Sequence, residues 1–159
     1  MLFWMKNNRK RNKVAGSSPA VQVSVSLEEV KQAVRKYEAD MPEGINRKSL
    51  LQPDGSLDLR RLSRYLGGVS DQKFYLSRET YEIFEEADRE IPYYLDLVQV
   101  AVDTYMEETG KLPVLKPNPP YQVDFRLLQT EHYLKEIPPF PLYITDQEML
   151  LTHRPKQVI

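Results

Sequence analysis

The residues of this chain that are best placed to do chemistry together lie in its most apolar stretch. Asp96, Gln99, Asp103 and Glu107 recur at steps of three and four within YYLDLVQVAVDTYMEE. On a helix, residues at these steps share a face, so the four side chains would form a polar stripe. Asp96 and Asp103 could face a pocket as paired carboxylates and, with an arginine, form the site of an enzyme. The stripe could equally be the exposed edge of a mostly buried helix, or make hydrogen bonds inside the fold.

A second group of residues indicates binding rather than catalysis. The chain opens with MLFWMKNNRKRNK, a short apolar run followed by five positive charges and no acidic residue. Apolar insertion and positive charge together hold a protein on an anionic membrane. The same charges could bind nucleic-acid phosphates, but tryptophan and phenylalanine beside them favour lipid. The candidate contact residues are Leu2, Phe3, Trp4, Met5, Lys6, Arg9, Lys10, Arg11 and Lys13.

The rest of the chain carries the opposite charge. Beyond the first 20 residues, 17 basic and 23 acidic residues give a net charge of −6, whereas the first 20 residues carry +5. We therefore expect the N-terminal arm, not the body, to contact an anionic surface, with nucleic acid as the weaker alternative. The partner of the body would be an unidentified protein. Ten tyrosines and the proline-rich loops KPNPP and IPPFP would suit such a contact surface.

Several kinds of site are excluded or disfavoured by residue type and spacing. The chain has no cysteine, which excludes disulfides, thiolate metal sites and cysteine nucleophiles. Its two histidines, His132 and His153, fall in no metal-binding spacing or triad motif. Glu79, Glu82 and Glu86 would share the solvated face of a helix, without a further ligand at a matching spacing. We therefore predict no metal site and no cofactor.

Periodicity, capping residues and turn signals predict an α+β fold. VQVSV alternates as a half-buried strand does, and Ser26 with Glu29 forms a capping box at the start of a helix. Ser77 is a second N-cap candidate, and Asp124 is a third. In chain order, we predict a strand over 21–25, a helix from 26 to about 40, a short helix over 58–66, a strand over 74–76, a helix over 77–87, a long helix over 92–110, a short helix after 124 and a hairpin around 145–148.

These elements predict two parts of the chain. Residues 1–20 would be a flexible apolar-basic arm, and residues 21–159 a single α+β domain. That domain would contain a central buried helix, several short helices and a small antiparallel sheet that includes the C-terminal hairpin. The long helix is expected at the centre because apolar residues wrap most of its circumference.

Three phrases carry a resemblance to known proteins. FYLSRETYEIFEE, LDLVQVAVDTYMEETGKLPV and LYITDQEMLLTHRP resemble a family of small uncharacterised proteins from Bacillus and its relatives, from about Val21 onward. That resemblance implies no activity. The segment from Leu95 to Pro139 is also similar to pilin-like and pseudopilin proteins, in which a long helix leads into a phrase like VDTYMEETGKLPV. Those proteins carry a long hydrophobic N-terminal segment, which this sequence lacks.

Together these features predict a bacterial, non-enzymatic interaction or regulatory module. We expect it in the cytoplasm, at the inner face of the cell membrane, attached peripherally through its N-terminal arm. One alternative is an enzyme whose site is built on the stripe that contains Asp96 and Asp103. The other is nucleic-acid binding through the basic arm.

Overall fold

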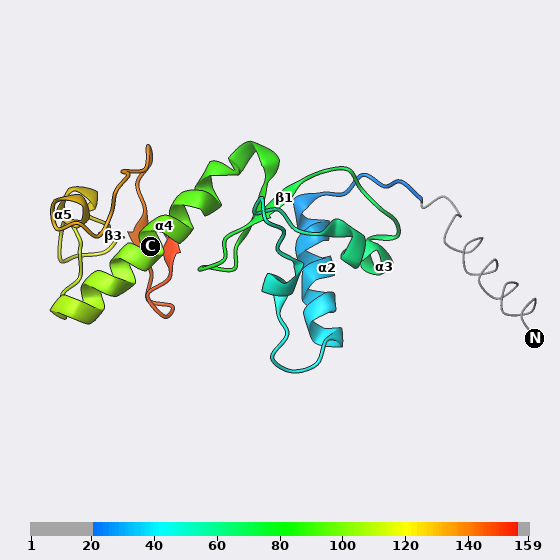
Figure 1. The fold of residues 1–159 in the computed structure, drawn as a ribbon, viewed down its shortest axis with the longest axis horizontal. Coiled ribbons are helices and arrows are strands. Elements are labelled where there is room, and N and C mark those ends of the chain that lie inside the picture. The colour runs from blue at the N-terminus through cyan, green and yellow to red at the C-terminus, as the bar shows by residue number, and fades with distance from the viewer. Residues whose placement is uncertain (1–20, 156–159) are drawn as a thin grey trace, which may run out of the picture.

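Residues 21–155 are described by a computed structural model (Figure 1). The nine candidate membrane-contact residues of the N-terminal arm lie outside the described residues. Within 21–155 the chain forms four α-helices, several short 3-10 turns and two small antiparallel sheets. This is the predicted α+β fold, including its C-terminal hairpin.

The first half of the described chain is built around α2 (Leu27–Asp40). The predicted capping box is present, because the Ser26 hydroxyl accepts a hydrogen bond from the Glu29 backbone N–H at 3.1 Å and the Glu29 carboxylate accepts one from the Ser26 N–H at 2.9 Å. The other elements of this half are η1 (Arg47–Leu50), η2 (Leu59–Leu62), α3 (Ser63–Leu66), β1 (Phe74–Leu76) and β2 (Ile83–Glu85). Their buried side chains form one cluster, the N-terminal core.

The second half is built around α4 (Glu90–Thr109), which ends at Gly110 with φ = 71°. The predicted helix after Asp124 is α5 (Phe125–Thr130), and the Asp124 carboxylate accepts from the Leu127 N–H at 3.1 Å. The remaining elements are η3 (Glu86–Asp88), β3 (Tyr121–Gln122), β4 (Tyr143–Ile144) and β5 (Leu151–Thr152). The three strands form an antiparallel sheet in the order β3-β4-β5. Their apolar side chains and those of α4 form the C-terminal core.

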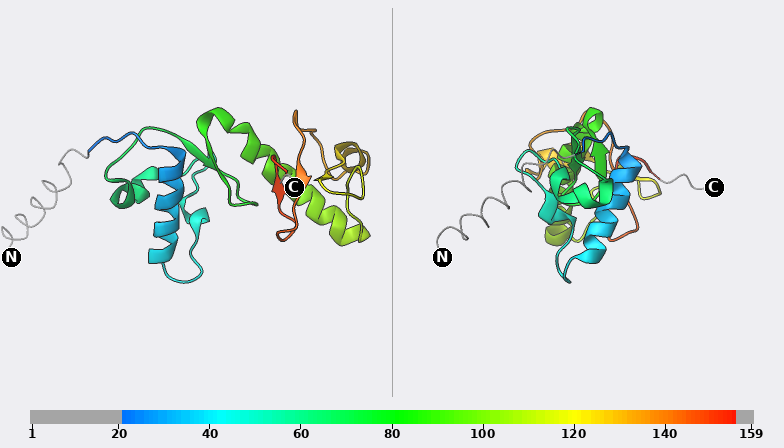
Figure 2. Two further views of the ribbon diagram at one scale, coloured as in Figure 1. Left: turned by 180° about the vertical axis from the view of Figure 1, so that it is seen from behind. Right: turned by 90° about the vertical axis from the view of Figure 1, so that its right-hand side faces the viewer.

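The β1–β2 hairpin lies between the two cores. Neighbouring residues of a strand point to opposite faces, and Ile83 of β2 packs in the N-terminal core while Phe84 packs in the C-terminal core. Figures 1 and 2 show α2 and α4 in separate halves of an elongated molecule, with this hairpin between them. Helix α4 is therefore the main helix of the C-terminal core. One face of it is open to solvent, where Tyr93 is 56% exposed and Val100 is 52% exposed.

The helix predicted over 77–87 is wrong. Ser77 does act as a cap, because its hydroxyl accepts from the Thr80 N–H at 3.0 Å, but the chain then turns back at Tyr81, which has φ = 67°. The residues that follow pair with β1, and Tyr75 lies opposite Phe84. Aromatic and β-branched residues favour a strand at this position, and pairing with β1 decides the outcome. Glu79, Glu82 and Glu86 consequently share no helical face.

The strand predicted over 21–25 is reduced to an isolated bridge between Gln22 and Val69. The alternation of valine and polar residues in this segment reflects packing against the N-terminal core, not pairing in a sheet. Val25 is buried in that core and Val23 is partly buried. The close approach of the two segments requires glycine at position 68, since a Cβ there would collide with the Val21 carbonyl oxygen.

Candidate functional site

Asp96, the first residue of the polar stripe, anchors the loop between β1 and β2. Its carboxylate accepts three hydrogen bonds, from the Ser77 hydroxyl at 2.7 Å, the Arg78 N–H at 3.1 Å and the Glu79 N–H at 3.0 Å. These donors fix the start of residues 77–82, called the 77–82 loop below. A carboxylate that is held by three donors inside its own chain is arranged for structure.

Gln99, the second residue of the stripe, is buried and covers the free edge of β5. Its side-chain amide donates to the Met149 carbonyl at 3.2 Å and accepts from the Leu151 N–H at 2.8 Å. A neighbouring strand would make the same two bonds, so this amide takes the place of one. It also holds a turn in which both Glu148 and Met149 have positive φ.

The stripe therefore does not converge on one site. Asp96 faces the 77–82 loop and Gln99 faces β5, whereas Asp103 and Glu107 are exposed. Asp103 accepts a hydrogen bond from the Gln99 amide at 3.0 Å. Asp96 also borders a shallow hollow beside the exposed face of α4, together with Tyr93 and Val100. The two carboxylates expected to pair over a pocket thus serve different contacts.

A larger groove lies elsewhere, where the 77–82 loop meets the three-stranded sheet. It has a volume of about 800 Å³. Its apolar part comes from two prolines of the KPNPP segment and from β4, β5 and the turn between them. Its polar part contains hydroxyls, two acids and one arginine. The main lining residues are Thr80, Glu82, Pro119, Pro120, Tyr121, Tyr143, Ile144, Asp146, Leu150, Leu151 and Arg154.

Glu82 is the distinctive residue of this groove. Its side chain is half-buried, and burial raises the pKa of its carboxyl above the ordinary value of 4.5, although the charges of Lys31 and Arg154 act in the opposite direction. Within residues 21–155 neither cation forms an ion pair with it, and no donor forms a hydrogen bond with it. A carboxylate in apolar surroundings without a partner is unfavourable, and such groups cluster at functional sites.

Two further polar atoms near this groove have no partner among the described residues. They are the hydroxyl of Thr80, which lines the groove, and Nδ1 of His153, which lies between the lining residues Thr152 and Arg154. Both atoms are buried. Buried polar groups in folded proteins are almost always hydrogen-bonded. Of these two atoms, only the Thr80 hydroxyl belongs to a residue that lines the groove, because the His153 ring packs against Phe84 of the C-terminal core, with ring centres 5.5 Å apart.

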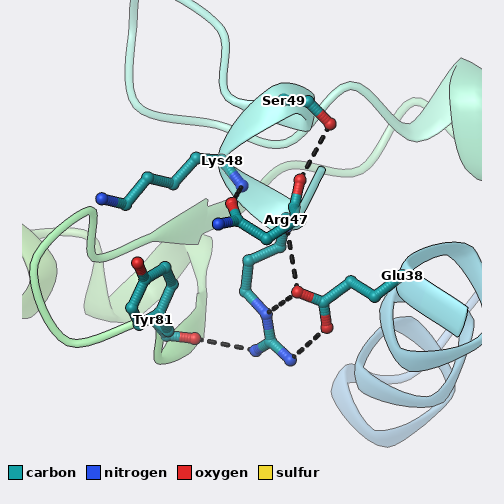
Figure 3. Close-up of polar contacts among 6 residues, drawn as sticks. Glu38, Arg47, Lys48, Ser49 and Tyr81 are labelled. Atoms are coloured by element: carbon teal, nitrogen blue, oxygen red, sulfur yellow. Dashed lines mark hydrogen bonds and ion pairs between the residues drawn. The ribbon is translucent and has the colours of Figure 1, made fainter. Parts of the chain in front are cut away.

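The 77–82 loop that carries Glu82 is also held from the N-terminal half (Figure 3). The Arg47 guanidinium donates to the Tyr81 carbonyl at 2.8 Å and forms a two-pronged ion pair with Glu38, at 2.8 and 3.2 Å. Arg47 holds the pKa of the Glu38 carboxyl below its ordinary value. The Lys48 ammonium lies 5.0 Å from the centre of the Tyr81 ring. Such forked arginine contacts fix both partners in orientation.

Tyr81 is in a strained conformation because it is a non-glycine residue with φ = 67°. Backbone strain of this kind persists where the surroundings hold it, and it is common at functional sites. Here Asp96 holds the start of the loop and Arg47 holds its end. The two anchors come from different halves of the molecule and fix the backbone on either side of Thr80 and Glu82.

Sequence reasoning did not find this site. The sequence pattern predicts Glu82 on the solvated face of a helix. In the structure Glu82 follows a turn that depends on Arg47, which lies 34 residues from Tyr81 in the chain. The phrase YEIF does carry a local strand signal, since aromatic and β-branched residues favour strands. That signal could have predicted that Glu82 lies outside a helix. It could not have predicted the groove, because the three-stranded sheet that forms the other wall begins only at Tyr121.

We expect the stability of the protein to fall as the pH drops below about 6.5. Burial, with a smaller contribution from Arg154, lowers the pKa of His153 below its ordinary value of 6.5, while Asp88 opposes the shift. The unfolded chain therefore takes up this proton at a higher pH than the folded chain, and stability is lost as pH falls through 6.5. Urea midpoints at pH 7.5 and 6.0 measure the loss, which should shrink in His153→Gln and persist in His132→Asn. Equal losses in the two variants would contradict this role.

The chain matches a known protein family. Residues 20–153 match a family described as "Protein of unknown function (DUF3939)". The chain belongs to this family. The match confirms the expected likeness to an uncharacterised family, and membership in DUF3939 assigns neither a Bacillus origin nor a pilin-like character. No curated protein and no solved structure matches the chain.

Among the described helices, none is both long and apolar enough to cross a membrane. Over residues 21–155, His, Asp and Glu side chains form no group of three that could hold a metal ion. The groove at the 77–82 loop is thus the candidate functional site.

Proposed function

We propose that this DUF3939 protein is a non-enzymatic interaction module that attaches peripherally to an anionic membrane through its N-terminal arm. Its groove receives the binding partner. The observation that carries the proposal is the groove at the 77–82 loop, where the Glu82 carboxylate and the Thr80 hydroxyl have no hydrogen-bond partner within residues 21–155 while the loop backbone is anchored from both halves. A pre-formed hollow with unsatisfied polar groups is typical of a binding site.

Binding is favoured over catalysis by the surroundings of the carboxylates. Asp96, the candidate base of an enzyme, has both oxygens engaged by the 77–82 loop. Glu82 has no hydrogen bond to a second titratable group within 21–155, and acid–base catalysis depends on such positioned groups. These contacts suit a site that recognises a ligand.

The membrane half of the proposal rests on charge. Residues 1–20 carry +5 and the rest of the chain −6. An anionic surface attracts the arm, at about 1 kcal/mol for each lysine or arginine near the lipid headgroups, and repels the body. The apolar residues Leu2, Phe3, Trp4 and Met5 supply the second signal that stable attachment requires.

We expect Trp4, the sole tryptophan, to report this attachment directly. Vesicles rich in phosphatidylglycerol should shift its emission to the blue, and neutral phosphatidylcholine vesicles should not. In the full chain, replacing Arg9, Lys10, Arg11 and Lys13 with glutamine should remove the shift at 0.15 M salt, because four of the five charges are lost. Emission that stays at its solution wavelength with anionic vesicles would overturn the membrane proposal, and a response to duplex DNA alone would favour nucleic-acid binding.

A further inference from the structure

We infer that the groove is a binding site for a cationic segment with apolar residues, and that its occupant is the N-terminal arm of the same chain, residues 1–13. The inference rests on the proposed function, because it gives the arm two competing ligands, the membrane and the groove. Bound in the groove, the arm is withheld from the membrane and the groove is closed to a partner. Release of the arm makes both available together.

The chemistry of the groove selects a cation. Ionised Glu82 lies half-buried without an ion-pair partner among the described residues, and a lysine or arginine entering the groove would supply one. Asp146 adds a second negative charge where it lines the groove, and it is exposed. Arg154 also lines the groove and acts on Glu82 only through its longer-range charge. Arg154 therefore leaves Glu82 available to an incoming cation.

The same groove offers apolar surface beside these charges. Ile144, Leu150 and Leu151 lie in its wall, next to the rings of Tyr121 and Tyr143. Leucine, phenylalanine and tryptophan side chains gain most from such burial. Thr80 also lines the groove, and its buried hydroxyl has no hydrogen-bond partner among residues 21–155.

The N-terminal arm has this combination of residues. Its apolar run, Leu2 to Met5, directly precedes the basic run that begins at Lys6. Its charge of +5 is complementary to the −6 of the remaining chain. Lys6 lies 15 residues before Val21, a stretch that spans at most about 50–54 Å when extended. A compact folded chain of 159 residues has a radius of gyration of about 15 Å. The arm can therefore reach the groove from Val21, and its tether gives it an effective concentration in the millimolar range.

The decisive variant is Glu82→Gln in the full chain. It removes the charge and keeps the shape of the side chain. Since burial disfavours the ionised form of Glu82, the variant should fold and unfold at an equal or slightly higher temperature than the wild type. Glu107→Gln makes the same charge change on an exposed residue of α4 and serves as the matched control.

Two readouts use Trp4. Without vesicles, acrylamide should quench Trp4 less in the wild type and in Glu107→Gln than in Glu82→Gln, because only the last releases the arm. With phosphatidylglycerol vesicles, Glu82→Gln should bind more tightly than the wild type, by up to about tenfold, which is the effect of one charge-assisted contact. Both differences should disappear in 0.5 M salt.

The outcomes separate this inference from the proposed function. If vesicles bind all three proteins equally and Trp4 is equally accessible in all, the groove does not hold the arm and the membrane function stands. If no protein binds vesicles but Glu82→Gln alone exposes Trp4, the groove inference stands and the membrane function falls. Equal effects of Glu82→Gln and Glu107→Gln would reduce the result to general electrostatics and overturn the inference. Protection of Trp4 that grows with protein concentration would also overturn it, because the occupant would then belong to a second copy.

Discussion

Replacing Gln99 with leucine is expected to destabilise the protein by about 1–3 kcal/mol, because the buried Leu151 N–H loses its acceptor and the more exposed Met149 carbonyl loses a donor. Those groups are the Leu151 N–H, which donates to the Gln99 side chain at 2.8 Å, and the Met149 carbonyl, which accepts from it at 3.2 Å. Leucine fills a similar volume, so the loss reports the hydrogen bonds more than a cavity. For a chain of this length the melting temperature should fall by roughly 2–12 °C.

Two measurements check the Gln99 prediction. Urea unfolding followed by circular dichroism gives the change in the free energy of unfolding. Hydrogen exchange should show the Leu151 amide losing more protection than amides in α2, since the edge of β5 is uncovered locally. Glu107→Gln, at an exposed position of the same helix, should stay within about 0.5 kcal/mol of the wild type. If Gln99→Leu is as stable as this control, water replaces the hydrogen bonds of the Gln99 amide without loss of stability, and the prediction is wrong.

Replacing Asp96 with alanine is expected to destabilise the protein by about 2–4 kcal/mol, because three donors lose a charged acceptor and the Ser77 side chain is buried. Asp96→Asn should lose less, about 1–2 kcal/mol. Its remaining oxygen can still accept from the Ser77 hydroxyl and the Glu79 N–H. Its amide nitrogen, however, would face the Arg78 N–H, where a carboxylate oxygen stands in the wild type.

The ranking of Asp96 variants distinguishes an anchor from a catalytic base. An anchor predicts that alanine is worse than asparagine in unfolding free energy, and that hydrogen exchange accelerates at Glu79 and Thr80 in both variants. Asp103→Ala, which removes an exposed carboxylate of the same stripe, should cost less than about 1 kcal/mol. Stability unchanged in Asp96→Ala would show that the loop is held without this carboxylate, leaving it available for chemistry.

The groove also shows how a site can be held at some cost to stability. Glu82 is half-buried with a raised pKa, while Arg47 and Asp96 hold the strained loop beside it. Proteins retain such unfavourable groups where a ligand uses them. Glu82→Gln should thus be at least as stable as the wild type while losing the groove's affinity for a cation.

Much of the fold was predictable from local signals in the sequence. The capping box of Ser26 and Glu29, the cap at Asp124 and the glycine after α4 all act within a few residues, so α2, α5 and the end of α4 follow from neighbours in the chain. The C-terminal hairpin is equally local, since its turn spans only residues 145–150. Likeness to an uncharacterised family was also visible in the sequence and is confirmed by the match over residues 20–153.

The roles of the polar residues were decided by tertiary structure alone. Gln99 and Leu151 are 52 residues apart, Asp96 and Glu79 are 17 apart, and Arg47 and Tyr81 are 34 apart. No periodicity within one helix encodes these partners, so a stripe at steps of three and four could be an active site or a set of anchors. The hairpin pairing of Tyr75 with Phe84 likewise turned the predicted helix over 77–87 into a loop and a strand. It thereby placed Glu82 in a groove, because the pairing of β2 with β1 buries Ile83 and Phe84 in the two cores and outweighs the local capping signal of Ser77.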